Sequence, residues 1–180
     1  INFGDVQLVS ISPELFFSSS AGVMKSSPIK GTRPRVEDET ADREISDSLV
    51  NNEKERAENL MIVDLVRNDF TKVAKIDSVI TEKLFELKTF SSVHQLVSTV
   101  SAQLEDNRSV LHAIKSLFPA GSMTGAPKHS AVSFLASAEG HRRGLYSGAF
   151  GWIGSNGDSE LAMTIRSIVI SGGECSIGVG

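Results

Sequence analysis

The chain has 180 residues, 40% hydrophobic and 22% charged, which excludes a disordered protein and fits one globular domain. Its formal net charge of −4 argues against nucleic acid as a partner. The single cysteine, Cys175, cannot form an internal disulfide and weakly favours a reducing, cytoplasmic setting, and no apolar run predicts a membrane span.

The first residues predict strands. Residues 6–10 are mostly apolar, and a second strand around Val23 and Met24 follows the turn SSSAG. Between them Glu14 stands in the string SPELFF. A carboxyl group among apolar residues has a raised pKa and is suited to donate a proton. The alternative is an exposed glutamate at a strand end.

The string SSPIKGTRPR, residues 26–35, predicts a stiff loop or a strand end, because its two prolines fix the backbone. Gly31 permits a sharp turn or a close approach to a ligand. On such a support Lys30 is a candidate nucleophile, since a partly buried lysine can lose its proton. Lys30, Arg33 and Arg35 could together bind an anion, and a solvated basic loop is the alternative.

Residues 37–48 are acidic and polar and predict a loop that leads into a helix over residues 51–70. Asn52 and Glu55 form a possible capping box at the start of this helix. The apolar stripe of the helix is Met61, Ile62, Leu65 and Val66.

Glu58 shares a helix face with Glu55 and with that stripe, so it is expected to point towards the body of the protein. Two carboxylates on one face could help to hold Mg²⁺. The alternatives are the capping box for Glu55 and an ion pair with Lys54 for Glu58.

Farther along, residues 78–80 and 93–100 predict strands joined by an irregular segment. His94 lies in the second of them, and a lone histidine is more often a hydrogen-bonded core residue than a catalyst. Asp106 or Asn107 is a candidate cap for a helix that runs to Leu117.

The string GSMTGAPK, residues 121–128, predicts the start of a helix that ends near Gly140. Thr124 is a possible cap, and Pro127 suits the first turn. Exposed N–H groups at such a start favour an anion, although glycine before a helix is common.

The last part predicts strands in residues 146–154, 160–170 and 175–180, joined by the hairpin turns SNGD and SGGE. Arg166 lies inside the very apolar second run, and a buried arginine needs a partner. A substrate carboxylate and an internal Asp or Glu are both candidates. Because the chain begins and ends in strand-like residues, we expect residues 1–180 to be one domain that is truncated at both ends.

Seven strings match one family in order and with compatible spacing. They are SPELF (12–16), PIKGTRPR (28–35), RAENLMIVDLVRND (56–69), VHQLVS (93–98), FPAGSMTGAPK (118–128), RRGLYSGAFGW (142–152) and AMTIRS (162–167). Together they resemble the chorismate-binding domain shared by anthranilate synthase component I, aminodeoxychorismate synthase component I, and the isochorismate and salicylate synthases.

The resemblance implies an α/β sandwich of antiparallel sheets with outer helices. It also implies a Mg²⁺-dependent chorismate enzyme. Anthranilate synthases of the family look like PIAGTRPR, whereas aminodeoxychorismate synthases carry PIKGT with a nucleophilic lysine. Lys30 therefore implies amination of chorismate at C4, towards p-aminobenzoate and folate. Anthranilate synthesis, another chorismate reaction and an inactive fragment are the alternatives.

The family mechanism, carried over, gives Glu14 and Lys30 the catalytic roles. Glu14 protonates the departing C4 hydroxyl while Lys30 attacks C2. Ammonia, released from glutamine by an amidotransferase subunit or domain, then adds at C4 and expels the lysine. Glu58 matches a Mg²⁺ ligand, and Glu55 sits near the metal.

Other positions match residues that bind chorismate. They are Gly31, Thr32, Thr124, Gly125, Tyr146, Arg166, Gly178 and Gly180. Two departures stand out. Where the family usually has a histidine directly before LVS, this chain has Gln95. The family domain also extends farther at both ends, and a further glutamate ligand for Mg²⁺ lies beyond Gly180.

Overall fold

The computed structural model describes residues 1–179. The strands are β1 (Val6–Ser10), β2 (Leu15–Ser20), β3 (Val23–Ser27), β4 (Ile29–Pro34), β5 (Ile80–Thr89), β6 (Val93–Gln103), β7 (Ala149–Ile153), β8 (Ser159–Met163), β9 (Ser167–Ser171) and β10 (Glu174–Ile177). The helices are α1 (Glu39–Val50), α2 (Glu53–Thr71), α3 (Val110–Leu117), α4 (Gly121–Thr124) and α5 (Lys128–Ala138).

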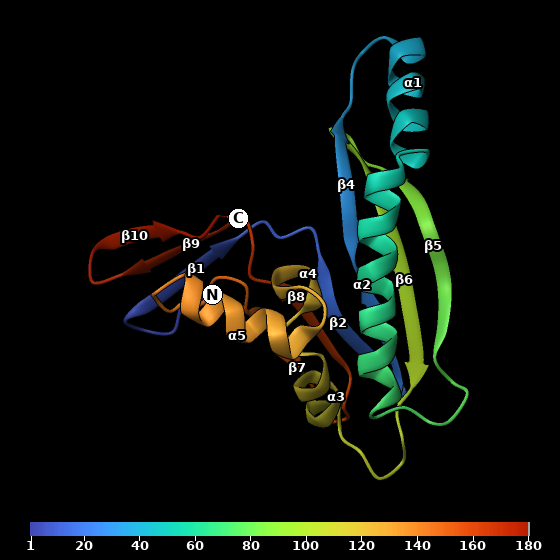
Figure 1. The fold of residues 1–180 in the computed structure, drawn as a ribbon. Coiled ribbons are helices and arrows are strands. Elements are labelled where there is room, and N and C mark those ends of the chain that lie inside the picture. Colours follow the sequence, from blue (N-terminus) through green and yellow to red (C-terminus); the bar gives the residue numbers. More distant parts are fainter. Residues whose placement is uncertain (180) are drawn as a thin grey trace.

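The strands described form two antiparallel sheets with helices packed outside them, which confirms the predicted fold class (Figure 1). The larger sheet has the order β4-β6-β3-β2-β8-β7, and β5 also pairs with β6. The smaller sheet has the order β1-β9-β10 and lies beside both chain ends. No helix within residues 1–179 is long and apolar enough to cross a membrane.

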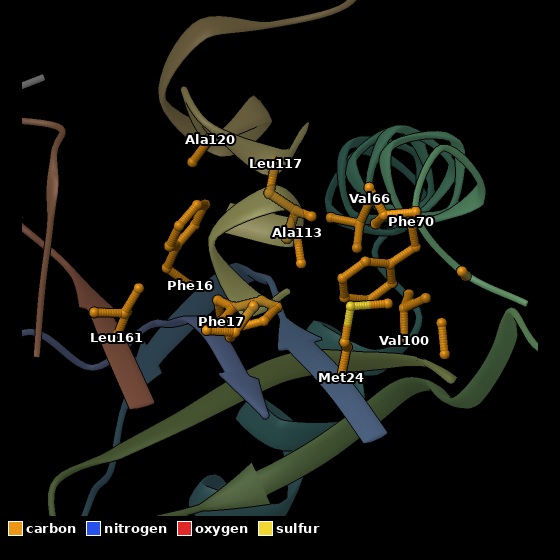
Figure 2. Packing of buried hydrophobic residues seen from close by; sticks show 14 of the residues in the cluster. Phe16, Phe17, Met24, Val66, Phe70, Val100, Ala113, Leu117, Ala120 and Leu161 are labelled. Atoms are coloured by element: carbon orange, nitrogen blue, oxygen red, sulfur yellow. The ribbon is translucent and has the colours of Figure 1, made fainter. Parts of the chain in front are cut away.

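The hydrophobic core lies between the larger sheet and the helices α2 and α3 (Figure 2). Phe17 from β2 and Phe70 from α2 are fully buried in it. Burial of a side chain of this size contributes about 1.5–3 kcal/mol. Helix α2 begins because Asn52 Oδ1 accepts the N–H of Glu55 at 3.0 Å. That half of the predicted capping box is confirmed.

The strands β3 and β4 follow one another along the same edge of β6, with Pro28 between them. Proline has no N–H, but the carbonyl of Pro28 accepts the N–H of Ser98 at 3.1 Å, so the line of pairing continues. Gly31 then takes a φ of +89° where the register of β4 against β6 shifts. This bulge holds Lys30 at a bend in the sheet.

Two segments expected to be irregular are regular. Residues 39–50 form α1, because Asp38 Oδ1 caps the N–H of Ala41 at 2.8 Å. Residues 80–89 form β5, a strand whose register shifts twice and in which Phe85 has a φ of +56°. Such bulges break the period-2 pattern by which a strand is recognised.

Three element boundaries also differ from expectation. Helix α3 begins after Ser109, whose N–H bonds to His112 Nδ1 at 3.1 Å, while Asp106 pairs with Lys75 at 2.7 Å instead of capping. The 121–128 segment contains α4 and then α5, which starts after Pro127. The 160–170 run is two strands, β8 and β9, each in one of the two predicted hairpins.

Candidate functional site

Glu14 and Lys30 line one cavity of about 340 Å³, which suits a small organic ligand. The hairpin of β2 and β3 brings them together. Leu15 pairs with Ser27, so the residue before β2 lies near the residues just after β3. The polar side chains that line the cavity are Glu14, Lys30, Ser122, Tyr146 and Arg166.

Glu14 is buried, with 8% of its surface exposed, so the exposed-glutamate alternative is wrong. Its carbonyl oxygen accepts the N–H of Met163 at 3.0 Å, which fixes the backbone against the end of β8. Burial raises the pKa of Glu14 above 4.5, and a hydrogen bond with Ser122 and the charge of Lys30 oppose that rise. A carboxyl group whose pKa is raised favours the protonated form and is suited to act as an acid.

Lys30 is half-buried in β4 and faces this cavity. Among residues 1–179 neither Lys30 nor Arg166 forms an ion pair. The site therefore presents two cations to the cavity that the described side chains do not neutralise. Such cations suit an anionic substrate.

Arg166 does not lie inside a strand, as its apolar surroundings predicted. It is exposed, has a φ of +49° and lies between β8 and β9, where the chain passes from the larger sheet to the smaller one. Its carbonyl oxygen accepts the N–H of Ile11 at 3.2 Å. A left-handed conformation at a non-glycine residue costs about 1–3 kcal/mol and is common at functional sites. The expectation of an internal Asp or Glu partner is wrong within residues 1–179.

Tyr146 and Gly178 line the cavity beside Arg166. A Cβ on Gly178 would lie 2.2 Å from Cγ of Tyr146, so only glycine lets the chain pass this close to the ring. The guanidinium of Arg143 lies 5.9 Å from the centre of the same ring. The predicted site residue Gly180 lies outside the described residues.

Gly31 and Thr32 lie next to Lys30 but turn towards other partners. A Cβ on Gly31 would lie 2.8 Å from Cδ1 of Leu49 and 3.2 Å from Oε2 of Glu55. The hydroxyl of Thr32 accepts a hydrogen bond from Nε2 of the buried Gln95 at 3.4 Å. Gln95 thus supports β4 from the position where the family usually has a histidine.

His94, one residue earlier, is a buried and hydrogen-bonded residue, as predicted for a lone histidine. Its Nε2 lies 3.0 Å from Oδ1 of Asp42, and its Nδ1 lies 3.0 Å from Oγ1 of Thr89. The hydrogen bond from Arg35 is the main reason why the pKa of Asp42 falls to about 2. These contacts hold α1 on the sheet and do not line the cavity.

The two other basic residues of the 26–35 string do not join Lys30 in an anion site. Arg33 Nη1 lies 3.4 Å from Oε1 of Glu55, and Arg35 Nη2 lies 2.9 Å from Oδ2 of Asp42. Their charges are thus neutralised by α2 and α1. The expectation of a three-cation cluster is wrong, and the cation that joins Lys30 at the cavity is Arg166.

Thr124 and Gly125 lie just outside the Glu14 cavity. Thr124 lines a neighbouring cavity of about 530 Å³, which also reaches Tyr146. It does not cap a helix, because its hydroxyl donates to the carbonyl of Ala120 at 3.0 Å. Gly125 ends α4 with a φ of +125°. Their neighbour Ser122 is the residue that reaches Glu14.

Glu55 and Glu58 lie near the start of α2, and neither is among the residues that line the Glu14 cavity. Glu55 pairs with Arg33, and Glu58 is half-exposed and 3.8 Å from Lys54. Among residues 1–179 no three His, Cys, Asp or Glu side chains gather into a metal cluster. One or two carboxylates suffice when substrate and water supply the other oxygens, so this pair fits the chemistry of a Mg²⁺ site.

Sequence reasoning did not find two polar features next to the cavity. One is Ser122, whose side chain bonds to Glu14. The other is the buried ion pair between Asp69 and Lys128. Both lie in strings that match the family, yet Asp69 and Lys128 are 59 residues apart along the chain. No local pattern predicts such a contact.

Comparisons with known proteins agree with the family resemblance of the sequence. The family profile described as chorismate binding enzyme matches residues 1–180. The aminodeoxychorismate synthase of Streptomyces griseus is 45% identical over 181 residues, which cover 100% of this chain and 25% of that protein. Anthranilate synthase component 1 of Pseudomonas putida is 39% identical over 180 residues, covering 99% of this chain and 36% of that protein. The chain therefore spans only about a quarter to two fifths of such relatives.

A solved structure is also similar. It is the crystal structure of anthranilate synthase component I from Streptococcus pneumoniae TIGR4, with a TM-score of 0.86 and 34% identity. The match covers 96% of this chain and 38% of that one. The expectation of an anthranilate-synthase-type fold is thus confirmed.

Proposed function

The chain belongs to the family of chorismate-binding enzymes, and from this premise we propose that it is part of an aminodeoxychorismate synthase. The reaction converts chorismate and ammonia to 4-amino-4-deoxychorismate and water. The observation that carries the proposal is Lys30, which faces the same cavity as the buried acid Glu14. In the family resemblance, a lysine at this position is typical of aminodeoxychorismate synthases, whereas anthranilate synthases have alanine.

The first step forms a bond between Nζ of Lys30 and C2 of chorismate. The ring double bonds shift, the C4–O bond breaks, and the hydroxyl leaves as water with the proton of Glu14. Glu14 supports this role because its burial raises its pKa and so favours the protonated form. Lys30 supports its role because, among the described residues, no carboxylate pairs with its amine.

The second step breaks the bond that the first step formed. Ammonia adds at C4, the double bonds shift back, and the bond between C2 and Nζ of Lys30 breaks. A proton of the incoming nitrogen passes to the carboxylate of Glu14, which restores the starting acid. The two steps balance, since one ammonia enters and one water leaves.

Chorismate carries two carboxylates, and the chain offers partners for both. Arg166, beside Tyr146, would bind the enolpyruvyl carboxylate. Glu58 and Glu55 would hold Mg²⁺, which when bound would neutralise the ring carboxylate. Within residues 1–179 Glu58 has only the exposed Lys54 as an ionic partner, so its carboxylate is accessible.

Ammonia would come from glutamine through a glutamine amidotransferase subunit or domain. Relatives named component 1, such as the anthranilate synthase component of Pseudomonas putida, support a partner of this kind. The product would enter p-aminobenzoate and folate synthesis in the cytoplasm. Anthranilate synthesis remains the second candidate, because these relatives share 39% identity with the chain.

Product analysis tests the proposal. The native enzyme is incubated with chorismate, ammonium and Mg²⁺, and the products are separated by liquid chromatography with mass detection. We expect 4-amino-4-deoxychorismate. Anthranilate as the main product would overturn the proposal in favour of the second candidate. No product, with chorismate still bound in a calorimetric titration, would indicate a binding module.

A further inference from the structure

The loop of residues 117–128 carries Ser122 to the acid Glu14. Ser122 and Glu14 line the same two cavities, and the Ser122 side chain lowers the pKa of the Glu14 carboxyl group. Helix α4 is a single turn of four residues within this loop, so its own hydrogen bonds do little to hold its place. Something outside the loop must therefore fix Ser122.

Two contacts fix the loop on α2. A Cβ on Gly121 would lie 2.1 Å from Cδ2 of Leu65, so this part of the loop packs directly on the helix. At the other end, Nζ of Lys128 donates to the carbonyl oxygen of Leu117 at 2.7 Å and to Oδ2 of Asp69. Lys128 thus joins both ends of the loop to each other and to α2.

Asp69 is a second buried carboxylate near the site, with 3% of its surface exposed. Its Oδ1 also accepts a hydrogen bond from Nζ of Lys72 at 2.8 Å. The two lysines differ in their surroundings. The Lys72 side chain is 55% exposed and lies on the same helix as Asp69, whereas that of Lys128 is 16% exposed and comes from the loop.

A small internal cavity connects Asp69 with Glu14. Its volume is about 20 Å³, and its polar lining residues include Glu14, Ser26, Asp69 and Ser122. A space of this size with several polar neighbours can hold one ordered water molecule. Asp69 and Glu14 thus line the same small cavity, and a charge on Asp69 would act on Glu14 across it.

We propose that Lys128 is a positioning residue for Glu14, an inference that rests on the role of Glu14 in the proposed function. Lys128 closes the 117–128 loop so that Ser122 reaches the acid. It also neutralises Asp69, so that this second carboxylate does not strengthen the hold of Glu14 on its proton.

The charges around Glu14 make the direction of the effect clear. Lys30 from β4 lines its cavity and favours the ionised form. Arg166, from the link between β8 and β9, and Tyr146 line the same cavity. A charge on Asp69 from α2 would favour the protonated form, and Lys128 from α5 pairs with Asp69. Loss of Lys128 would leave Asp69 with the exposed Lys72 alone, so Glu14 would keep its proton to higher pH.

The first experiment compares Lys128→Met with the matched control Lys72→Met in the native enzyme. Chorismate consumption is measured against pH. For Lys128→Met we expect kcat to fall about a hundredfold, as for a misplaced catalytic group, and the alkaline limb to move to higher pH. Lys72→Met should leave both unchanged. A Lys128→Met enzyme with unaltered rate and unaltered limb would overturn the proposal.

A second variant guards against a folding defect in the first, because a buried carboxylate that loses its partner is strongly destabilising. The double variant Asp69→Asn with Lys128→Met removes both charges. We expect its alkaline limb to return to the native position. Its rate should stay low, since Lys128 no longer joins the two ends of the loop. A double variant with the native rate would overturn the positioning role.

A measurement without substrate separates this inference from the proposed function. Thermal unfolding of the native protein and of Glu14→Gln is compared against pH, first alone and then in the Lys128→Met background. The pH range over which the two midpoints diverge should extend upward in that background. This result does not depend on which product the enzyme makes. An unchanged range would contradict the electrostatic part of the proposal, even if 4-amino-4-deoxychorismate is formed.

Discussion

The two ends of β4 use their basic residues in opposite ways. Arg33, near the end of the strand, and Arg35, just after it, pair with Glu55 and Asp42. Lys30, near the start of the strand, faces a cavity that it shares with Arg166, and neither forms an ion pair within residues 1–179. The same string of sequence thus supplies structural cations and chemically available ones.

This difference shows how to separate function from stability in a basic segment. A paired arginine has its charge compensated in the folded chain, so its loss mainly weakens packing. A cation with no protein partner gains its partner from a ligand, so its loss should mainly weaken binding or chemistry. The following changes test whether the two ends of β4 differ in this way.

The largest effect is expected for Lys30→Ala. Removal of a covalent nucleophile should lower the rate of C4 amination by about 10³-fold or more. Intact-protein mass spectrometry with chorismate and without ammonia should show an adduct in the native enzyme and none in the variant. Ammonia could then attack C2 directly, which would shift the product towards anthranilate.

An adduct that survives in the Lys30→Ala enzyme would eliminate Lys30 as the nucleophile. It would also remove the main reason to prefer C4 amination. The control is Lys25→Ala in the preceding strand β3, where Lys25 pairs with Glu82 at 2.9 Å on the surface. That variant should keep the adduct and the native product.

A smaller effect on binding is expected for Arg166→Ala. A lost charge-assisted hydrogen bond costs about 1.5–3 kcal/mol, so KM for chorismate should rise about 10–150-fold. The matched change just after the far end of β4 is Arg35→Ala, which should lower thermal stability and leave KM unchanged. Equal effects of the two changes on KM would break the comparison.

For Glu58→Gln we expect weaker Mg²⁺ binding with an intact fold. Calorimetry of chorismate binding at several Mg²⁺ concentrations should show at least about a tenfold loss in apparent Mg²⁺ affinity. Asp64→Asn is the control, because Asp64 lies exposed on the same helix and pairs with Arg67 at 3.4 Å. If Glu58→Gln and Asp64→Asn behave alike, Glu58 is only the ionic partner of Lys54.

The sequence was sufficient for the features that depend on local pattern. The hairpin at SSSAG and the cap at Asn52 both follow from residues close in the chain. The burial of Glu14 did not, because its local sequence also fitted an exposed glutamate at a strand end. Features that depend on distant contacts were not predictable. The apolar run around Arg166 indicated one strand, but the chain turns there to change sheets, and the residue is exposed.

The structure of the polar segments was not predicted for a related reason. Residues 39–50 lack a continuous apolar stripe, and their helix is held by Asp42 and Leu49 against the sheet. The buried charge pair of Asp69 with Lys128 likewise joins α2 to a loop far along the chain. Resemblance to a family located these strings, whereas only the fold shows which side chains meet.

The smallest effect concerns the stability of the fold itself and uses Glu14→Gln. Burial raises the pKa of Glu14 in the folded protein above the value near 4.5 that it has when unfolded. Below pH 4.5 the group is protonated in both states and its charge has no effect on folding. As pH rises further, the unfolded chain releases this proton first, so folding loses stability until the folded carboxyl also ionises.

Glutamine has nearly the same shape and never ionises, so the variant should escape this loss. Its thermal midpoint should match that of the native protein at low pH and exceed it at neutral pH. For a domain of this size, each kcal/mol corresponds to about 2–4 °C. Calorimetric scans from pH 4 to pH 9 would measure the difference. A difference between the two midpoints that stays constant across that range would mean that folding does not raise the pKa of Glu14. A variant less stable than the native protein at neutral pH would mean the same. The charges at the Lys30 end of β4 would then be as fully compensated as those of Arg33 and Arg35.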